Sequence, residues 1–449
     1  MFRYQLRSLA VFCIAICMLI LSCKKDEVSS SNFVRDIAGD MVIVATYTDT
    51  EGNLYITGNF SGVVTLDSIT LTSKGDYDIL LAKYDGLGNI LWARSAGNIE
   101  KDEASDIVVD NTGNIYLAGN FYGNTTFEST SLLSHGDKDV FWAKYDSEAK
   151  LLWAKSAGGI GKDEARSLAT DVSGRPYLTG AFSETVIFGS SSVISHGGTD
   201  VFVARLDNLG SVQWVKQMGE SGNDSGCGIA VDGLGNIFVA GFFVGSVTLD
   251  NLTYTSYGGK EGFVIKMNAD GEIKVVHTAN GFKDDEFQSI VVDKSNNVYI
   301  TGYFTESADF DGVTYFSAGD ADICIVRLDT TGAKTWQRTS GGAGKDISYG
   351  IALDRLDNVY ITGYFNGSAK FGSVTITSSG EDDVFVVKYN NLGDIQWVKS
   401  AGSSSIDSGN DVATSPDNNV YIAGHHTNDI VLDGTKLTGT GPFLWKVKQ

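Results

Sequence analysis

Hydrophobic residues between positions 102 and 158 fall into four short runs, separated by polar and glycine-containing turns. The runs are rich in β-branched and aromatic residues, which favour strands, and no helical periodicity extends over a useful length. We therefore predict strands at 106–109, 115–121, 140–145 and 151–156. A tight turn at 110–114 joins the first two strands, and a longer connection joins the second and third.

The same pattern returns every sixty-one residues along the chain. Its most recognisable phrase reads GNLYITGNF at 52, GNIYLAGNF at 113, GRPYLTGAF at 174, GNIFVAGFF at 235, NNVYITGYF at 296, DNVYITGYF at 357 and NNVYIAGHH at 418. Seven copies at constant spacing indicate a repeat protein. Each unit is too small to bury its own core, so it must stack on its neighbours.

The first three strands of each unit are apolar at nearly every position. A sheet with one covered face alternates apolar and polar residues, so these strands belong to sheets covered on both faces. The sequence thus predicts an all-β fold, a seven-bladed β-propeller of four-stranded antiparallel blades over residues 32–449. A solenoid is the alternative, but its ends need polar caps, and the sequence shows no such caps.

The two ends of the repeat region are complementary. Residues 33–39 align with the fourth strand of the first repeat at 91–97, whereas the last repeat stops after a third strand at 443–447. We predict that the N-terminal strand pairs into the C-terminal blade. Such pairing closes the ring and removes two exposed sheet edges.

The repeated phrase is followed by a third strand of the form G-x-x-D-V-F-V-A-K-Y-D and a fourth of the form W-x-K-S-x-G. Together these motifs resemble the SBBP-type β-propeller repeat, and the resemblance covers essentially all of residues 32–449. It implies a seven-bladed propeller. It implies no particular activity, because this repeat occurs in many secreted bacterial proteins without an agreed chemistry.

Charge and cysteine content narrow the classes of partner. The net charge is −21 and no basic stripe is present, which argues against nucleic acid as a partner. Cys227 and Cys324 lie in predicted strands and are expected to fill the core; we expect no disulfide between them and no CxxC metal site. We expect a monomer whose partner is a protein or a glycan.

The N-terminus resembles a bacterial lipoprotein signal. Two early arginines precede an apolar run at 9–21, and Ser22-Cys23 follows in a context similar to a lipobox. The resemblance implies a signal peptide at 1–22, acylation of Cys23 and a tether at 23–31, with membrane contact through the lipid alone. An ordinary signal peptide or an uncleaved anchor is the alternative.

The residues after Cys23 look like the surface-export signal of lipoproteins in the Bacteroidota. That resemblance rests on Lys25, Asp26 and Glu27, and a generic charged tether is the alternative. We therefore expect an outer-membrane lipoprotein at the cell surface, or otherwise on the periplasmic face.

Two acidic sets recur with the repeat. One lies just before the first strand and comprises Asp102, Asp163, Asp224, Asp285, Asp346 and Asp407; the other precedes the third strand and comprises Asp78, Asp139, Asp200, Glu261, Asp322 and Asp383. A carboxylate present in six units favours a structural role. The alternative is a ligand-binding ring of the first set at one mouth of the channel, which can hold Ca²⁺, a cation that prefers oxygen ligands.

The last repeat departs from the others at His425 and His426, where His426 replaces an aromatic residue. Adjacent residues of a strand point to opposite sides, so the two imidazoles do not readily bind one metal. We expect a packed or solvated pair, close to the mouth that contains Asp407.

No catalytic motif is evident in the sequence: there is no G-x-S-x-G elbow, no HExxH and no cysteine beside an apparent base. The sequence favours a lipid-anchored binding or scaffold module that presents its loops to a ligand, without a cofactor. The alternatives are a carbohydrate-active hydrolase or lyase with Asp or Glu catalysts at the channel mouth, and a purely structural envelope component.

Overall fold

The computed structural model describes residues 33–249 and 252–447. The expectations for residues 1–22, Cys23, Lys25, Asp26 and Glu27 lie outside the described residues. Residues 32–449 form one compact unit. The described residues form strands, which confirms the all-β prediction. Among them, no helix is long and apolar enough to span a membrane.

Each repeat contributes an inner strand, a second strand and a third strand that pair in sequence order. The inner strands are β2 (Ala38–Thr48), β7 (Asp102–Val109), β11 (Asp163–Thr170), β15 (Ser225–Val231), β21 (Glu286–Val292), β25 (Ile347–Leu353) and β29 (Asp407–Thr414). The second strands are β3 (Leu54–Leu66), β8 (Ile115–Phe127), β12 (Pro176–Phe188), β16 (Ile237–Phe243), β22 (Val298–Phe310), β26 (Val359–Phe371) and β30 (Val420–His426). The third strands are β5 (Asp78–Tyr84), β9 (Thr130–Tyr145), β13 (Ser191–Leu206), β19 (Glu261–Met267), β23 (Val313–Leu328), β27 (Val374–Tyr389) and β33 (Gly441–Val447).

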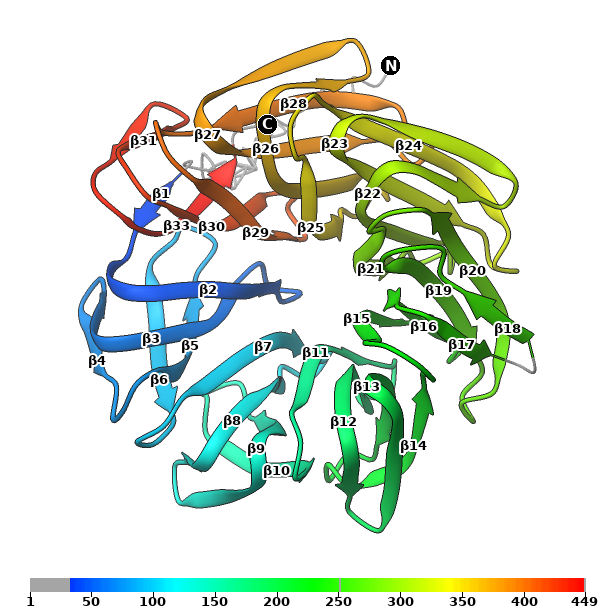
Figure 1. Ribbon diagram of the computed structural model, residues 1–449. Coiled ribbons are helices and arrows are strands. Elements are labelled where there is room, and N and C mark those ends of the chain that lie inside the picture. The colour runs from blue at the N-terminus through cyan, green and yellow to red at the C-terminus, as the bar shows by residue number, and fades with distance from the viewer. Residues whose placement is uncertain (1–32, 250–251, 448–449) are drawn as a thin grey trace, which may run out of the picture. The chain divides into compact units, whose positions relative to one another are not determined.

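A fourth strand completes each sheet on its outer edge. These strands are β6 (Ile90–Ala96), β10 (Leu151–Gly159), β14 (Val212–Met218), β20 (Ile273–Gly281), β24 (Lys334–Gly342), β28 (Ile395–Ala401) and, beside β33, β1 (Val34–Asp36). The remaining strands are short hairpin segments: β4 (Ile69–Thr72), β17 (Ser246–Leu249), β18 (Leu252–Thr255), β31 (Ile430–Leu432) and β32 (Thr435–Leu437). Figure 1 shows the inner strands around a common centre, with the other strands of each repeat outside them.

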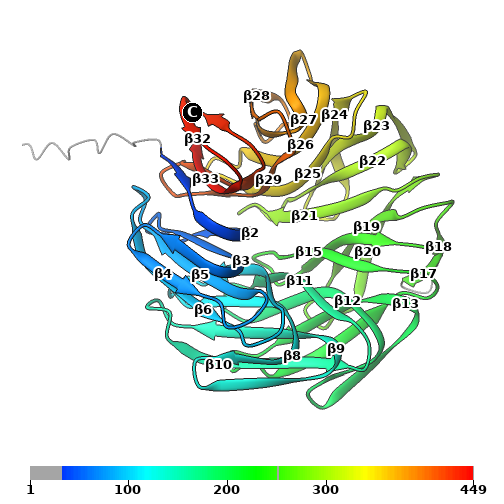
Figure 2. The same ribbon diagram turned by 60° about the vertical axis from the view of Figure 1, so that its left-hand side comes forward.

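The first strand of the chain pairs with the last. β1 and β33 run antiparallel, with Val34 opposite Trp445 and Asp36 opposite Phe443, and the two views in Figures 1 and 2 place them side by side. The amide of Lys446 donates to the carbonyl of Phe33 at 2.9 Å. The sheet therefore joins segments that are about four hundred residues apart in sequence.

The predicted strands of the second repeat are all present, and all four are longer than predicted; β10 ends at Gly159 rather than at residue 156. β7 begins four residues before the predicted position, and β8 and β9 extend through the predicted connection to form one hairpin, in which Phe127 pairs with Thr130. The predicted turn at 110–114 is formed by Asp110, whose carboxylate accepts the amides of Thr112 and Asn114 at 2.9 and 3.0 Å.

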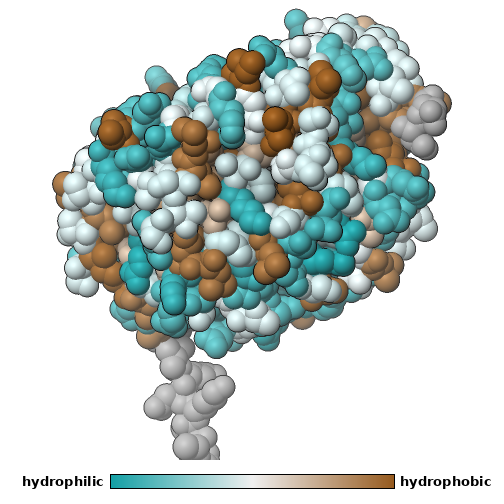
Figure 3. Space-filling model, turned by 90° about the horizontal axis from the view of Figure 1, so that it is seen from below, coloured by the Kyte–Doolittle hydropathy of each residue, from teal (hydrophilic) through white to brown (hydrophobic). Residues whose placement is uncertain are grey.

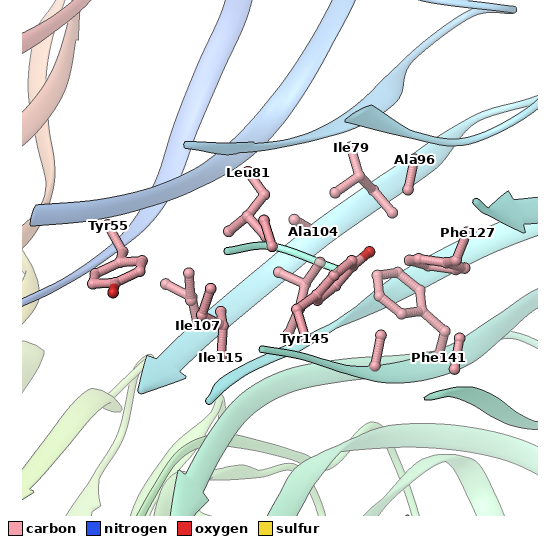
Figure 4. Close-up of a cluster of buried hydrophobic side chains, with 14 of the residues drawn as sticks. Tyr55, Ile79, Leu81, Ala96, Ala104, Ile107, Ile115, Phe127, Phe141 and Tyr145 are labelled. Carbon is pink, nitrogen blue, oxygen red and sulfur yellow. The ribbon is translucent and has the colours of Figure 1, made fainter. Parts of the chain in front are cut away.

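The hydrophobic core lies between consecutive sheets. Figure 4 shows one such layer, in which Ile79, Leu81 and Ala96 of one repeat meet side chains such as Ile107 and Phe141 of the next. Both faces of a sheet that lies between two others are thus covered, as the non-alternating pattern of apolar residues indicated. On the outer side visible in Figure 3, hydrophobic and hydrophilic residues are interspersed.

Cys227 and Cys324 are free thiols buried in this core. Burial raises the pKa of the Cys227 thiol to about 12. Both cysteines therefore act as small packing residues rather than nucleophiles.

Candidate functional site

The six aspartates predicted before the first strands are buried, each with 0% of its surface exposed: Asp102, Asp163, Asp224, Asp285, Asp346 and Asp407. Their carboxylates accept backbone amides of nearby loops. Asp102 accepts from Asn98 at 2.8 Å, and Asp407 accepts from Thr427 at 3.1 Å. An accessible acidic ring at the channel mouth is therefore not formed, because these carboxylates are held inside the boundary between repeats.

The second acidic set lies beside the first across the boundary between consecutive repeats. Burial raises the pKa of Asp224 to about 7, and the nearby charge of Asp200 contributes. Lys144, a cation on the third strand β9, contacts a turn residue rather than this set. That lysine lies over the Tyr116 ring at 4.7 Å and 4.0 Å from the turn residue Asp110.

The two histidines of the last repeat occupy different environments. His426 is fully buried; its Nδ1 is 2.8 Å from the carbonyl of Asn428, and its Nε2 is 4.0 Å from Asp36. His425 is half-buried, and burial lowers the pKa of its imidazole. His426 lies directly opposite Asp407 in the strand pairing and packs near Phe443, so it belongs to the core of the last sheet.

A cavity of about 440 Å³ is lined by residues of the inner strands of every repeat. Its lining combines aliphatic side chains with hydroxyl groups such as those of Thr46, Ser167 and Ser289. Two carboxylates, Asp106 and Asp411, are the charged groups among the lining residues. The residues that line the cavity thus include two carboxyl groups and no cationic side chain.

Asp106 and Asp411 also link neighbouring inner strands. Asp106 accepts the amide of Leu168 at 2.7 Å, and Asp411 accepts the amide of Thr46 at 2.7 Å. Each carboxylate is open to the cavity on one side but surrounded by protein on the others. This desolvation raises the pKa of Asp106 to about 6 and that of Asp411 to about 7, with the charge of Asp106 contributing to the second.

Sequence reasoning missed these two aspartates. The signal was present, because the corresponding positions of the other repeats hold Ala45, Ser167, Gly228, Ser289 and Gly350. An acid in two of seven copies departs from the repeat, and such departures mark positions that the shared scaffold does not require.

A second cluster, also missed, comes from strands β22, β25 and β26. Tyr303, Tyr349 and Tyr364 are half-buried and form what we call the tyrosine cluster. The rings of Tyr349 and Tyr364 are 5.8 Å apart at 53°. Tyrosine combines a flat apolar surface with a polar tip, which suits contact with a partly polar ligand.

A buried glutamate contacts Tyr303 of the tyrosine cluster. Glu286 is 5% exposed and accepts the hydroxyl of Tyr303 at 3.1 Å and the amide of Gln288 at 2.8 Å. Lys260 contacts the same carboxylate at 2.7 Å. The network fixes the position of Tyr303 without leaving Glu286 unpaired.

The tyrosine cluster also consists of departures from the repeat. The position of Tyr303 and Tyr364 is occupied by Asn59, Asn120, Ala181, Phe242 and His425 in the other units.

Within residues 33–249 and 252–447, no group of three or more His, Cys, Asp or Glu side chains is arranged to hold a metal ion.

Comparison with known families identifies the repeat. A model of the SBBP β-propeller repeat matches residues 213–241 and 338–368. These two segments carry the SBBP repeat. Each matched SBBP segment runs from a fourth strand through the next inner strand into a second strand, so it spans a boundary between units and includes one acid of the first set, Asp224 or Asp346.

Two curated relatives share this region. Regulatory protein FlaEY of Caulobacter vibrioides is 25% identical over 380 residues, which is 78% of this SBBP-repeat chain and 39% of FlaEY. The uncharacterized WD repeat-containing protein L264 of Acanthamoeba polyphaga mimivirus is 26% identical over 279 residues, 51% of this chain and 20% of L264. The matched part is thus less than half of either relative.

Comparison with solved structures matches YCF48 bound to D1 peptide. It is 8% identical with a TM-score of 0.43 and aligns over 93% of this chain and 95% of its own. A protein of unknown function from Bacteroides caccae is 10% identical with a TM-score of 0.37, over 72% of this chain and 89% of its own.

Proposed function

We propose that residues 32–449 form a closed seven-bladed propeller that acts as a binding module, anchored to the cell envelope by a lipid on Cys23. Two features support the closed ring: the inner strands of all repeats line one cavity, and β1 pairs with β33. A closed ring positions loops from different units rigidly around one axis. Function in such a fold resides in the residues that differ between units.

The observation that carries the binding role is the tyrosine cluster. Three half-buried tyrosines gather where other units have different residues, and Glu286 fixes one of them. Tyrosine supplies large contact area at low cost in conformational entropy, and it is enriched at residues that dominate binding energy. We propose that a protein or glycan ligand contacts this cluster.

Replacing Tyr349 and Tyr364 by alanine is expected to weaken ligand binding at least tenfold, which corresponds to about 1.4 kcal/mol. Immobilised full-length protein would be screened against neutral oligosaccharides and against peptides from the cell envelope. Tyr315→Ala is the matched control, since Tyr315 is a half-buried tyrosine of the outer hairpin that packs on Phe310.

Equal loss of binding in the control and the double variant would contradict a role for the cluster. Turnover of an oligosaccharide, seen as newly released reducing ends, would instead support the hydrolase. Absence of both binding and turnover across the screen would favour a purely structural component of the envelope.

The anchor makes a separate prediction. Protease treatment of intact cells is expected to release propeller fragments from the wild type, whereas a Lys25→Ala/Asp26→Ala/Glu27→Ala variant is expected to be protected. Cys23→Ser is expected to move the protein out of the membrane fraction. Protection of both the wild type and the triple variant would contradict surface export and indicate the periplasmic face.

A further inference from the structure

Six boundaries between consecutive repeats each contain two buried acids. The pairs are Asp78 with Asp102, Asp139 with Asp163, Asp200 with Asp224, Glu261 with Asp285, Asp322 with Asp346, and Asp383 with Asp407. All twelve side chains are at most 5% exposed. Like charges placed together away from water are costly, so these pairs need a compensating interaction.

The geometry is clearest at Asp200 and Asp224. One oxygen of each acid accepts a backbone amide: Asp200 Oδ2 accepts from His196 at 3.0 Å, and Asp224 Oδ1 accepts from Val244 at 2.9 Å. The other two oxygens, Asp200 Oδ1 and Asp224 Oδ2, are buried without a hydrogen-bond partner among the described residues. A Cβ atom built on Gly219 would lie 2.8 and 2.5 Å from them, so both oxygens converge on one small region.

Each of the other boundaries also has at least one buried acid oxygen without a partner among the described residues. Asp78 and Asp102 have one each, whereas the remaining boundaries have one on a single acid of the pair: Asp163, Asp285, Asp322 and Asp383. The bonded oxygens again accept backbone amides, as for Asp78 from Lys74 at 3.1 Å and Asp322 from Ala318 at 3.1 Å. A buried acid oxygen without a partner at every one of the six boundaries is thus a feature of the repeat.

Chemistry limits what these oxygens can hold. Ca²⁺ takes six to eight oxygen ligands, whereas the groups that contact each pair are mainly backbone N–H donors. A proton needs only the two carboxylate oxygens, as in paired carboxyl groups that share one proton because both cannot ionise. We propose that each of the six boundaries binds one proton, shared between its two carboxyl groups, in mildly acidic solution.

The raised pKa values of these acids agree with this geometry. Burial raises the pKa of Asp224 to about 7 and that of Asp285 to about 8, and in each case the neighbouring acid contributes. The other titratable groups that face the Asp200–Asp224 pair are His196 on β13 and Glu220 on the loop before β15. Neither is hydrogen-bonded through its side chain to the two unpartnered oxygens.

The boundary at which the chain ends meet is different. Met41 and Gly441 occupy the positions that hold the two acids at the other boundaries. Met41 pairs with Phe60, and Gly441 pairs with His426, as the acids pair with the equivalent second-strand residues elsewhere. This boundary therefore lacks the proton site. The stability of its packing does not depend on pH through protonation of paired acids.

The proton sites make stability depend on pH with a defined sign. An acid whose pKa is raised by folding binds its proton more tightly in the folded state than in the unfolded state. The stabilisation of the folded state by these protons is fully present below the ordinary aspartate pKa near 4. It is lost as pH rises through about 7. The protein is thus more stable at pH 5 than at pH 8.

Asp224→Asn tests one boundary directly. Its side-chain oxygen can still accept the Val244 amide, while its amide group donates to Asp200 Oδ1 in place of the shared proton. The full-length variant is expected to keep or raise the wild-type Tm at pH 8. It is also expected to lose a part of the fall in Tm between pH 5 and 8, because distant sites contribute additively and the other boundaries, with Asp106 and Asp411, keep their share. Asp270→Asn, at an exposed turn, is the control and leaves that fall unchanged.

Infrared spectroscopy of the wild type gives an independent readout that does not require the variant to fold. Protonated carboxyl groups are expected in mildly acidic solution, and their band weakens in Asp224→Asn. Absence of that band in the wild type would overturn the proposal. A Tm at pH 8 that rises with added Ca²⁺ in the wild type but not in the variant would also overturn it, and would assign the pairs to a cation.

Discussion

A chain that begins at residue 40 is expected to unfold with a free energy roughly 5 kcal/mol lower than a chain that begins at residue 32, because it loses two buried side chains. Phe33 and Ile37 are 9% and 3% exposed and pack with Tyr421 and Leu444. The backbone bonds from Lys446 to Phe33 and from Ile37 to Pro442 are lost as well. Without β1, the edge of β33 is exposed, and an unpaired edge promotes aggregation.

Denaturant unfolding of the two purified chains would measure this difference. The chain that begins at residue 32 is the matched control, since it lacks the N-terminal segment but keeps β1. Equal midpoints and slopes for the two chains would show that β1 does not close the ring. A loss confined to the shorter chain supports the closure.

Gly302→Ala is expected to destabilise the protein by about 3 kcal/mol, because the added methyl group meets backbone rather than a movable side chain. A Cβ at this position would lie 2.0 Å from the carbonyl oxygen of Glu286 and 2.8 Å from the Cα of Phe287. Both neighbours belong to the inner strand β21, next to the irregularity in its pairing with β22. Relief of the contact therefore requires the two strands to separate.

Gly233→Ala provides the comparison. Gly233 is exposed, its φ is not in the left-handed region, and its Cβ would meet only the side-chain oxygen of Asn296 at 3.1 Å. Thermal unfolding should show a large drop in Tm for the first substitution and little change for the second. Similar small effects in both would mean that the strand contact relaxes easily.

The same contact explains why the nine-residue phrase recurs. Its glycine is present in every unit, and a Cβ at each would lie within 2.3 Å of a carbonyl oxygen of the neighbouring inner strand: Gly58, Gly119, Gly180, Gly241, Gly302, Gly363 and Gly424. Sequence comparison located the glycine, but the reason for it is a contact between two strands. That contact becomes visible only when the inner strand is placed.

The candidate site was less predictable than the fold. The repeated acids were recognisable from their spacing, but their burial in pairs depends on which units become neighbours. Asp106, Asp411 and the tyrosine cluster are separated by long stretches of sequence, and no local pattern links Tyr303 to Tyr349. Their common signal was departure from the repeat, which identifies positions but not their distances.

The sequence by itself determined the strands, their order and the repeating unit, because apolar runs and turn residues act over a few neighbouring positions. It did not reveal that the hairpin between the second and third strands extends outward and pairs with the fourth strand of the preceding unit, as Gly159 does with Val186. Only the tertiary structure decided this pairing and the convergence of acids such as Asp200 and Asp224. The physical reason is that both depend on how one unit is rotated against the next, which side-chain packing across the whole layer determines.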